Sequence, residues 1–270
     1  VAVSGTQTAG AVYVGNGSNN ATYTFSGGTL NAASFTVQGN GSNDPGLGNA
    51  TLNNLTLNTD GNLAVGRWDL VIGGNSTVNI DGQLRSTSNG SGNGDWGRVT
   101  IQDSATVTAT GGVNSGGAVF GLTLNGGTLT TPSIRASELS YASGAKMVFN
   151  GTIVVPTQDN SNFLTVDISN RAYVGNSGAL FNTNGKNITI TTNLNNLSGH
   201  NGTIVKSGAG TLSLWAGSGD NFDNVYYQNL SGGMTITGGT VELTSQYIRM
   251  GSVTIENGGQ QNGAIVTWTE

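Results

Sequence analysis

The sequence of 270 residues has no cysteine, only three prolines and one histidine, and few charged residues. Without cysteine there is no disulfide framework, so stability must come from strand pairing and core packing. Only 9% of the residues are charged, against roughly 25% in an ordinary soluble domain. The net charge of -5 and the pI of about 4.7 argue against nucleic-acid binding, which requires clustered lysine and arginine.

Long apolar runs are also missing. No stretch of 18 apolar residues occurs, so no segment is expected to span a bilayer. The chain begins at Val1 without a charged and then apolar leader, which is typical of a mature product after signal removal. The polar but uncharged composition suits an extracellular scaffold. We therefore expect a secreted or cell-surface protein.

Glycine is the residue in excess, with 45 occurrences, more than twice its ordinary usage. The glycines alternate with short apolar runs and follow no Gly-X-Y period, so they indicate corners between strands and not collagen. Three segments share the pattern x-apolar-x-Gly-Gly-Thr-apolar, namely residues 24–30, 123–129 and 235–241. A short strand, a tight glycine corner and another strand form one winding unit of a solenoid.

The clearest unit spans residues 202–243. It begins with GTIVKSGAGTLSL, in which two alternating apolar runs flank the corner at residues 207–210. The pattern returns at residues 233–243 as GMTITGGTVEL. Between the two halves lies a longer and more aromatic insertion, residues 215–230.

This stretch resembles the autotransporter-associated β-strand repeat of bacterial type V passenger domains and other large secreted proteins. Residues 202–212 and Leu214 match the first half of that repeat, and residues 232–241 resemble its second half. The resemblance covers about 42 of the 270 residues, counted from 202 to 243. It implies a parallel β-helix that is exported to the cell surface and is usually non-enzymatic. It does not imply a catalytic site.

Taken together, the patterns predict an all-β protein that forms a single parallel β-helix, or β-solenoid, over residues 1–270. If one rung takes roughly 20 residues and rungs stack ~4.8 Å apart, there are about 12 to 13 rungs and a length of roughly 60 Å. Polar loops are expected near residues 86–97 and 156–162. Both ends are rich in β-forming residues, so we expect assembly strands there, with Val1, Val3, Ile265, Val266 and Trp268 as their apolar members.

A carbohydrate-active enzyme is the rival interpretation, because a catalytic site needs carboxylates that converge on one face. The candidates are Asp220 and Asp223, with Trp215, Tyr226 and Tyr227 as a platform for sugar stacking. The alternative is structural: aspartates three residues apart in a glycine-rich loop cap turns, and the aromatic side chains fill the space beneath the insertion. We favour the structural interpretation and predict no catalytic residue.

Metal and cofactor sites are not predicted. The loops at Asp44, Asp95 and Asp220 are rich in oxygen ligands that could suit calcium, but the tandem nonapeptide of calcium-binding β-rolls is absent. His200 is the only histidine and has no cysteine partner, so a transition-metal site is not expected. We place His200 in a solvated turn.

Threonine recurs in Thr-x-Thr pairs, which would resemble an ice-binding surface if they were ranked on one flat face. The pairs are Thr22/Thr24, Thr106/Thr108, Thr128/Thr130, Thr189/Thr191, Thr235/Thr237 and Thr267/Thr269. Their irregular spacing favours the simpler explanation that threonine is a preferred outward residue of strands.

The function expected from the sequence is that of a non-enzymatic structural or adhesive β-solenoid that can join head to tail into extracellular fibres. Its partners would be further copies of itself, or a cell-surface or glycan partner. The alternative is a carbohydrate-binding or polysaccharide-degrading β-helix that uses the loop with Trp215, Asp220 and Asp223. A further alternative is a passenger fragment whose remaining segments lie outside this chain.

Overall fold

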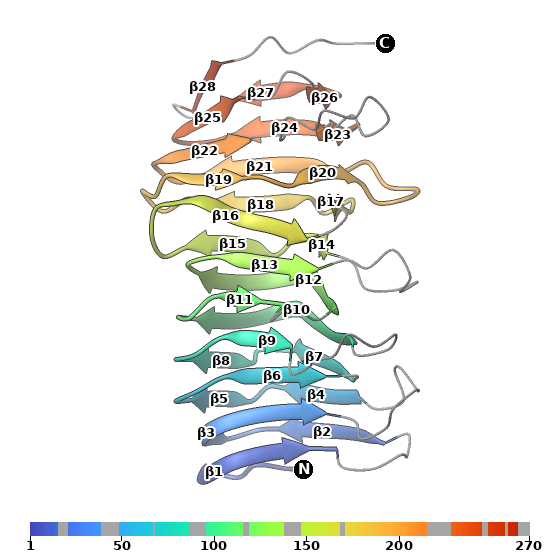
Figure 1. Ribbon diagram of the computed structural model, residues 1–270, viewed down its shortest axis with the longest axis vertical. Coiled ribbons are helices and arrows are strands. Elements are labelled where there is room, and N and C mark those ends of the chain that lie inside the picture. The colour runs from blue at the N-terminus through green and yellow to red at the C-terminus, as the bar shows by residue number, and fades with distance from the viewer. Residues whose placement is uncertain are drawn as a thin grey trace.

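The computed structural model is a parallel β-solenoid with no α-helix among the residues that it describes (Figure 1). These residues are 1–15, 21–38, 49–66, 68–86, 96–115, 119–137, 147–167, 171–214, 228–244, 248–256 and 259–263. The chain winds through successive turns, and each strand between the two ends pairs with the strand one turn before it and the strand one turn after it. This arrangement confirms the predicted fold class.

The strands form three faces that run the length of the molecule. The first face contains β2 (Thr22–Ser26), β4 (Asn49–Asn53), β7 (Asp69–Gly73), the first halves of β10 (Trp96–Ala109) and β12 (Val119–Thr131), β14 (Met147–Phe149), β17 (Arg171–Val174), β20 (Asn193–Asn196), β23 (Gln228–Leu230) and β26 (Ile248–Met250).

The second face contains the first halves of β1 (Thr6–Val14) and β3 (Thr29–Gln38), then β5 (Thr56–Thr59), β8 (Thr77–Ile80), the second halves of β10 and β12, β15 (Ile153–Pro156), β18 (Ala179–Asn182), β21 (Thr203–Ser207), β24 (Gly233–Ile236) and β27 (Val253–Ile255). Because β10 and β12 each cross from the first face to the second, these two faces adjoin, on the side away from the viewer in Figure 1.

The third face contains the second halves of β1 and β3, then β6 (Leu63–Gly66), β9 (Leu84–Ser86), β11 (Val113–Asn114), β13 (Ile134–Ser137), β16 (Asn160–Asp167), β19 (Ile188–Ile190), β22 (Thr211–Leu214), β25 (Thr240–Leu243) and β28 (Gln260–Gly263). Within the described residues this ladder holds eleven strands, from β1 to β28, and its height gives the length of the described solenoid.

The solenoid therefore has fewer turns than the 12 to 13 predicted, and ten strand spacings of ~4.8 Å give a length of roughly 50 Å. The prediction was wrong because a turn has three strands and a variable connection, so it often takes more than 20 residues. Paired residues one turn apart differ by 19 positions between Met234 and Val253, and by 34 between Asn195 and Asn229.

The core is a set of apolar columns inside the three faces. One column on the first face stacks the fully buried residues Leu52, Ile72, Ile101, Leu124, Phe149 and Val174 in register. Alternate residues of each strand point inward, as in the buried-and-intermediate pattern of β22, Thr211–Leu214. Inward positions therefore hold one continuous core, and outward positions hold threonine, asparagine and serine.

Glycine corners join the faces, as the sequence predicted. Gly127 has a φ of +71°, and a Cβ there would lie 2.2 Å from the carbonyl oxygen of Ala105 in the preceding turn. Only glycine tolerates both the backbone conformation and this close approach. The pairs Gly27/Gly28 and Gly126/Gly127 separate the first face from the second, whereas Gly238/Gly239 separates the second from the third.

The two halves of the repeat-like stretch lie directly above one another. β24 pairs with β21, and β25 pairs with β22, so the second half forms the next turn over the first. The predicted loop at residues 156–162 is shorter than expected, because Pro156 ends β15 and Asn160 begins β16. Of the loop predicted at residues 86–97, residues 87–95 lie outside the described part, whereas Ser86 ends β9 and Trp96 begins β10.

Candidate functional site

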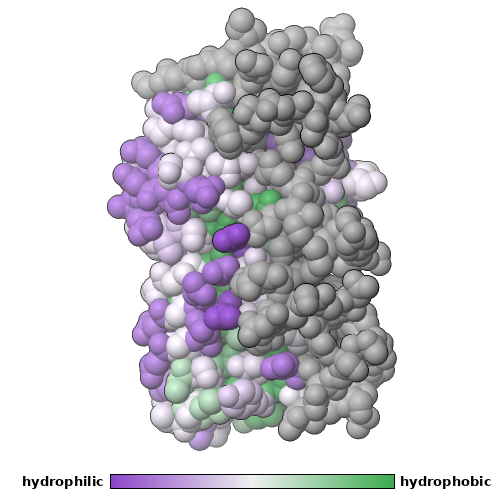
Figure 2. All heavy atoms as spheres, in the orientation of Figure 1, coloured by the Kyte–Doolittle hydropathy of each residue, from purple (hydrophilic) through white to green (hydrophobic). Residues whose placement is uncertain are grey.

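A shallow groove of about 480 Å³ lies where the second and third faces meet, beside β16, β19 and β22. It is lined by Asp159, Asn160, Ser161, Asn187, Ile188, Thr189, Thr211, Ser213 and Glu242. All but Ile188 are polar, and two are carboxylates. Figure 2 shows hydrophilic side chains gathered at this edge of the molecule, over the strands labelled β16, β19 and β22 in Figure 1.

A bulge in β16 forms one wall of the groove. Asn160 pairs with Ile188 and Leu164 pairs with Ile190, so a step of four residues on β16 faces a step of two on β19. The two extra residues break the alternation: Phe163 and Leu164 are both fully buried, whereas Ser161 is exposed. Bulges of this kind re-aim side chains at the surface.

Hydrogen bonds hold the polar side chains of the groove in place. The Asp159 carboxylate accepts a hydrogen bond from the backbone N–H of Asn187 at 2.9 Å, and the Asn187 side chain accepts one from the N–H of Thr211 at 3.0 Å. Farther along, the Ser213 hydroxyl donates to the Glu242 carboxylate at 3.0 Å. The groove thus offers fixed carboxylate, amide and hydroxyl groups, which are the groups that recognise sugar hydroxyls.

Beside the groove, the side-chain oxygen of Asn162 accepts hydrogen bonds from the hydroxyls of Thr165 and Thr191, each at 2.8 Å. Sequence reasoning did not select this site. Its signal in the sequence is the run Gln158-Asp159-Asn160-Ser161-Asn162, whose carboxylate and amides are also typical of the polar loop predicted at residues 156–162. The bulge that brings them to the surface comes from the pairing with β19, which a single sequence does not show.

The predicted glycan or partner loop lies outside the described residues. This applies to Trp215, Asp220, Asp223, Tyr226 and Tyr227, and also to the calcium candidates Asp44 and Asp95. Within the described ranges, no group of three or more His, Cys, Asp or Glu side chains could hold a metal ion. The half-buried His200 lies next to the turn after β20, where its Nδ1 accepts a hydrogen bond from the N–H of Asn176 at 3.3 Å.

The N-terminal residues are paired within the chain. Ala2 forms a parallel bridge with Ser26, and the N–H of Val3 donates to the carbonyl of Ser26 at 2.8 Å. Val1 is 67% exposed, whereas Val3 is buried at 8%. The other predicted assembly residues, Ile265, Val266 and Trp268, lie outside the described part of the chain.

The longer N-terminal strand β1 has a different environment. It pairs with β3 alone among the described strands, so its other edge has no strand partner there. Its inward residues Ala9 and Val12 pack on the core but are only partly buried. At the opposite end, Val253 and Ile255 of β27 continue the inward column of Met234 and Ile236.

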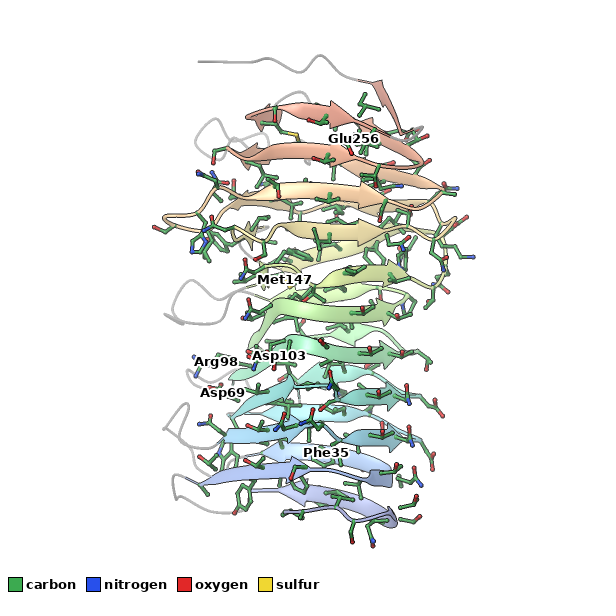
Figure 3. All side chains as sticks on the ribbon, turned by 180° about the vertical axis from the view of Figure 1, so that it is seen from behind. Phe35, Asp69, Arg98, Asp103, Met147 and Glu256 are labelled. Atoms are coloured by element: carbon green, nitrogen blue, oxygen red, sulfur yellow. The ribbon has the colours of Figure 1, made fainter. Side chains whose placement is uncertain are left out.

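An ion pair on the first face joins two neighbouring turns. Arg98 donates to both carboxylate oxygens of Asp69, at 2.6 and 2.7 Å, and Figure 3 shows the two residues one above the other. Both side chains are about one-third exposed, so the pair adds little stability.

No helix among the described residues is long and apolar enough to cross a membrane. No protein-family model matches the chain, and neither does any curated protein or any solved structure. Of what the resemblance of residues 202–243 to the autotransporter-associated repeat implies, the structure supports the parallel β-solenoid fold.

Proposed function

We propose that the protein is a non-enzymatic structural or adhesive β-solenoid of the bacterial cell surface, and that copies join head to tail through the ends of the solenoid. The observation that carries the proposal is the edge of β1, a strand of nine residues, that has no partner among the described strands. An edge strand of this length offers a row of backbone donors and acceptors to another chain.

The two ends of the solenoid are complementary. β1 begins the ladders of the second and third faces, and β27 and β28 are the last described strands of those same ladders. A second copy that places its β1 over β27 and β28 would continue both ladders in parallel. Gln7 of that second copy would then stack on Ile255 as the next member of the same inward column. Ile255 is 51% exposed although it occupies an inward position. Because copies stacked in this way advance along the solenoid axis, the contact between unlike ends does not close into a ring and produces a filament.

The composition supports an extracellular location. The outward positions hold mainly threonine, asparagine and serine, and only 9% of the sequence is charged. The passenger-like repeat at residues 202–243 supports export in the same way, through its resemblance to secreted β-helices. A chain that belongs to a longer passenger would use the same edges to continue its own solenoid.

The test is the state of association of the 270-residue protein, measured by light scattering over a range of concentrations and by negative-stain electron microscopy. We expect filaments whose thickness is one solenoid. Val12→Lys places a charge at the inward, half-buried position of β1 and should abolish them, because an inward-pointing charge on an edge strand would be buried without a partner when a second copy pairs there.

Tyr13→Lys is the matched control. Tyr13 is the next residue of β1, points outward and is 72% exposed, so its replacement should leave filaments intact. Removal of residues 264–270 tests the contribution of Ile265, Val266 and Trp268 in the same assay. Monomers at all concentrations in the unmodified protein would refute head-to-tail association.

Glycan binding is the second candidate, and the polar groove favours it. Asp159 and Glu242 line that groove with their carboxylates held by hydrogen bonds. A screen of soluble oligosaccharides should then show binding that Glu242→Gln weakens and Glu256→Gln, a change in an exposed residue outside the groove, does not. Equal binding by the two variants would move the glycan site elsewhere, to the loop with Trp215, Asp220 and Asp223.

A further inference from the structure

Six successive strands of the second face carry threonine at the same outward position. In register, these residues are Thr6, Thr29, Thr56, Thr77, Thr106 and Thr128. Two residues farther along each strand lies a second column, made of Thr8, Asn31, Asn58, Asn79, Thr108 and Thr130. We call these twelve residues the Thr/Asn array; none of them is charged.

The array is ordered from within. The Asn58 side chain donates to the Asn31 oxygen at 2.8 Å, and Asn79 donates to the Asn58 oxygen at 2.8 Å, so three turns share one amide ladder. Threonine is restricted at χ1 because it is β-branched. Between the columns, the inward residues from Leu30 to Leu129 are buried and fix the strands beneath.

The threonine hydroxyls of the array differ from those at the corners. Corner threonines are used internally: Thr59 donates to the carbonyl of Gly61 at 3.1 Å, and Thr131 to that of Ser133 at 3.0 Å. Within the described part of the chain, by contrast, no hydroxyl of the array hydrogen-bonds to another residue. The array hydroxyls are therefore available to a ligand.

The array repeats along two axes, and this repetition defines its ligand. Rows lie ~4.8 Å apart, and residues two positions apart within a strand lie roughly 6.7 Å apart. Seen from behind, the strands that carry the array run in parallel rows (Figure 3). A single peptide or glycan chain repeats along one axis only. A crystal surface repeats along two, and hexagonal ice has repeats close to both spacings.

We infer that the Thr/Asn array binds ice. Its hydroxyl and amide groups hydrogen-bond to water held at lattice spacing, and the threonine methyl groups lie between those waters. Because sheet pairing and the asparagine ladder fix the side chains in advance, little conformational entropy is lost when the surface binds. The array ends where Ile153, Leu180 and Val205 take over the first column.

The structure also explains why spacing in the sequence argued against such a surface. Of the Thr-x-Thr pairs in the sequence, Thr22 and Thr24 lie on the first face. Thr189 lies on the third face, and Thr191 directly follows the strand that carries it. The array threonines are irregular in sequence because the connections between turns differ in length, yet they are paired in register in space. Their partners in the second column are partly asparagine, which a search for Thr-x-Thr alone does not find.

The test is the behaviour of single ice crystals in a solution of the purified protein, measured as thermal hysteresis and crystal shape. The unmodified protein should show a gap between melting and freezing and should facet the crystal. Thr77→Lys, at the centre of the array, should lose most of this gap. Thr51→Lys is the matched control, because Thr51 is also half-buried and outward-facing but lies on the first face.

A triple variant with Thr56, Thr77 and Thr106 each changed to valine keeps the side-chain shape and removes three hydroxyls. It should retain the melting temperature of the unmodified fold and lose part of the hysteresis. No hysteresis in the unmodified protein, or equal loss in Thr77→Lys and Thr51→Lys, would overturn the inference. Binding of the unmodified protein to crystalline polysaccharide, without any shaping of ice, would also overturn the inference and would identify a different lattice as the ligand.

Discussion

The ammonium nitrogen of Lys206 lies 2.8 Å from the carbonyl oxygen of Gly238, one turn farther along the solenoid. It also donates to the carbonyls of Ser207 at 3.1 Å and Gly208 at 2.8 Å. The side chain is fully buried and occupies an inward position between Phe181 and Ile236. Lys206 thus links two corners through backbone carbonyls, and only glycine fits at position 239 beside its ammonium group.

The first prediction concerns the removal of this link. Lys206→Met keeps an apolar stem of similar length but leaves the carbonyls of Gly208 and Gly238 without the ammonium donor, at a cost of ~1 to 3 kcal/mol for each one that stays buried. The Ser207 carbonyl still accepts a hydrogen bond from the N–H of Thr183. Part of this cost is offset because a buried charge is no longer desolvated. We expect a net loss of about 2 kcal/mol in the free energy of unfolding, measured with urea. Lys186→Met, at a partly exposed position, should change it by less than about 0.5 kcal/mol.

The second prediction concerns pH. Burial lowers the pKa of Lys206 from 10.5 to about 8. Between pH 8 and 10.5 the unfolded chain therefore binds more protons at this residue than the folded chain does, so stability rises with pH there, by at most ~1.4 kcal/mol per unit. Below pH 8 both states are protonated and the contribution is flat. Urea unfolding from pH 7 to 11, with the Lys206→Met curve subtracted, measures it; a difference that is flat or falls with pH would contradict the pKa shift.

The third prediction concerns a corner. Gly127→Ala forces a side chain into a backbone with φ of +71° and against the Ala105 carbonyl, so it should lower the free energy of unfolding by more than about 2 kcal/mol. Gly10→Ala is the control, because Gly10 has no atom within 4 Å of an added Cβ and no positive φ. That control should be neutral or slightly stabilising. Similar losses in both would show that crowding at the corner is not the cause.

The fourth prediction concerns the asparagine ladder. Asn58 takes part in two side-chain hydrogen bonds, and Asn79 contributes to one of them. At ~1 kcal/mol or less for each bond at a partly exposed site, Asn58→Ala should cost about twice as much as Asn79→Ala. Thermal unfolding of both variants and of the double variant measures the ladder. Equal losses for the two single changes would mean that the Asn31 to Asn58 bond contributes nothing.

The fold could be predicted from the sequence because each strand carries its own local signal. Runs such as Thr211–Leu214 alternate inward and outward residues, and glycine corners interrupt them. The number of turns could not be predicted in this way, since it depends on connection lengths that vary between turns. The same Gly-Gly-Thr motif also serves two different corners, at Gly126/Gly127 and at Gly238/Gly239.

The surfaces were harder to predict than the core. The groove depends on a register shift between Asn160 and Leu164, and the Thr/Asn array depends on which turns stack in register. Both are properties of strand pairing between residues 20 or more positions apart, such as Asn58 and Asn79 at 21. A single sequence records the residues but not this alignment.

Each strand pairs almost entirely with the strands one turn above and below it, so no turn in the middle of the ladder depends on a distant one. Duplication or loss of one whole turn would leave every remaining inward column continuous. The rod can thus lengthen or shorten during evolution in increments of one strand spacing, ~4.8 Å. Such a molecule works as a ruler, whose reach is set by the number of copies of a short gene segment.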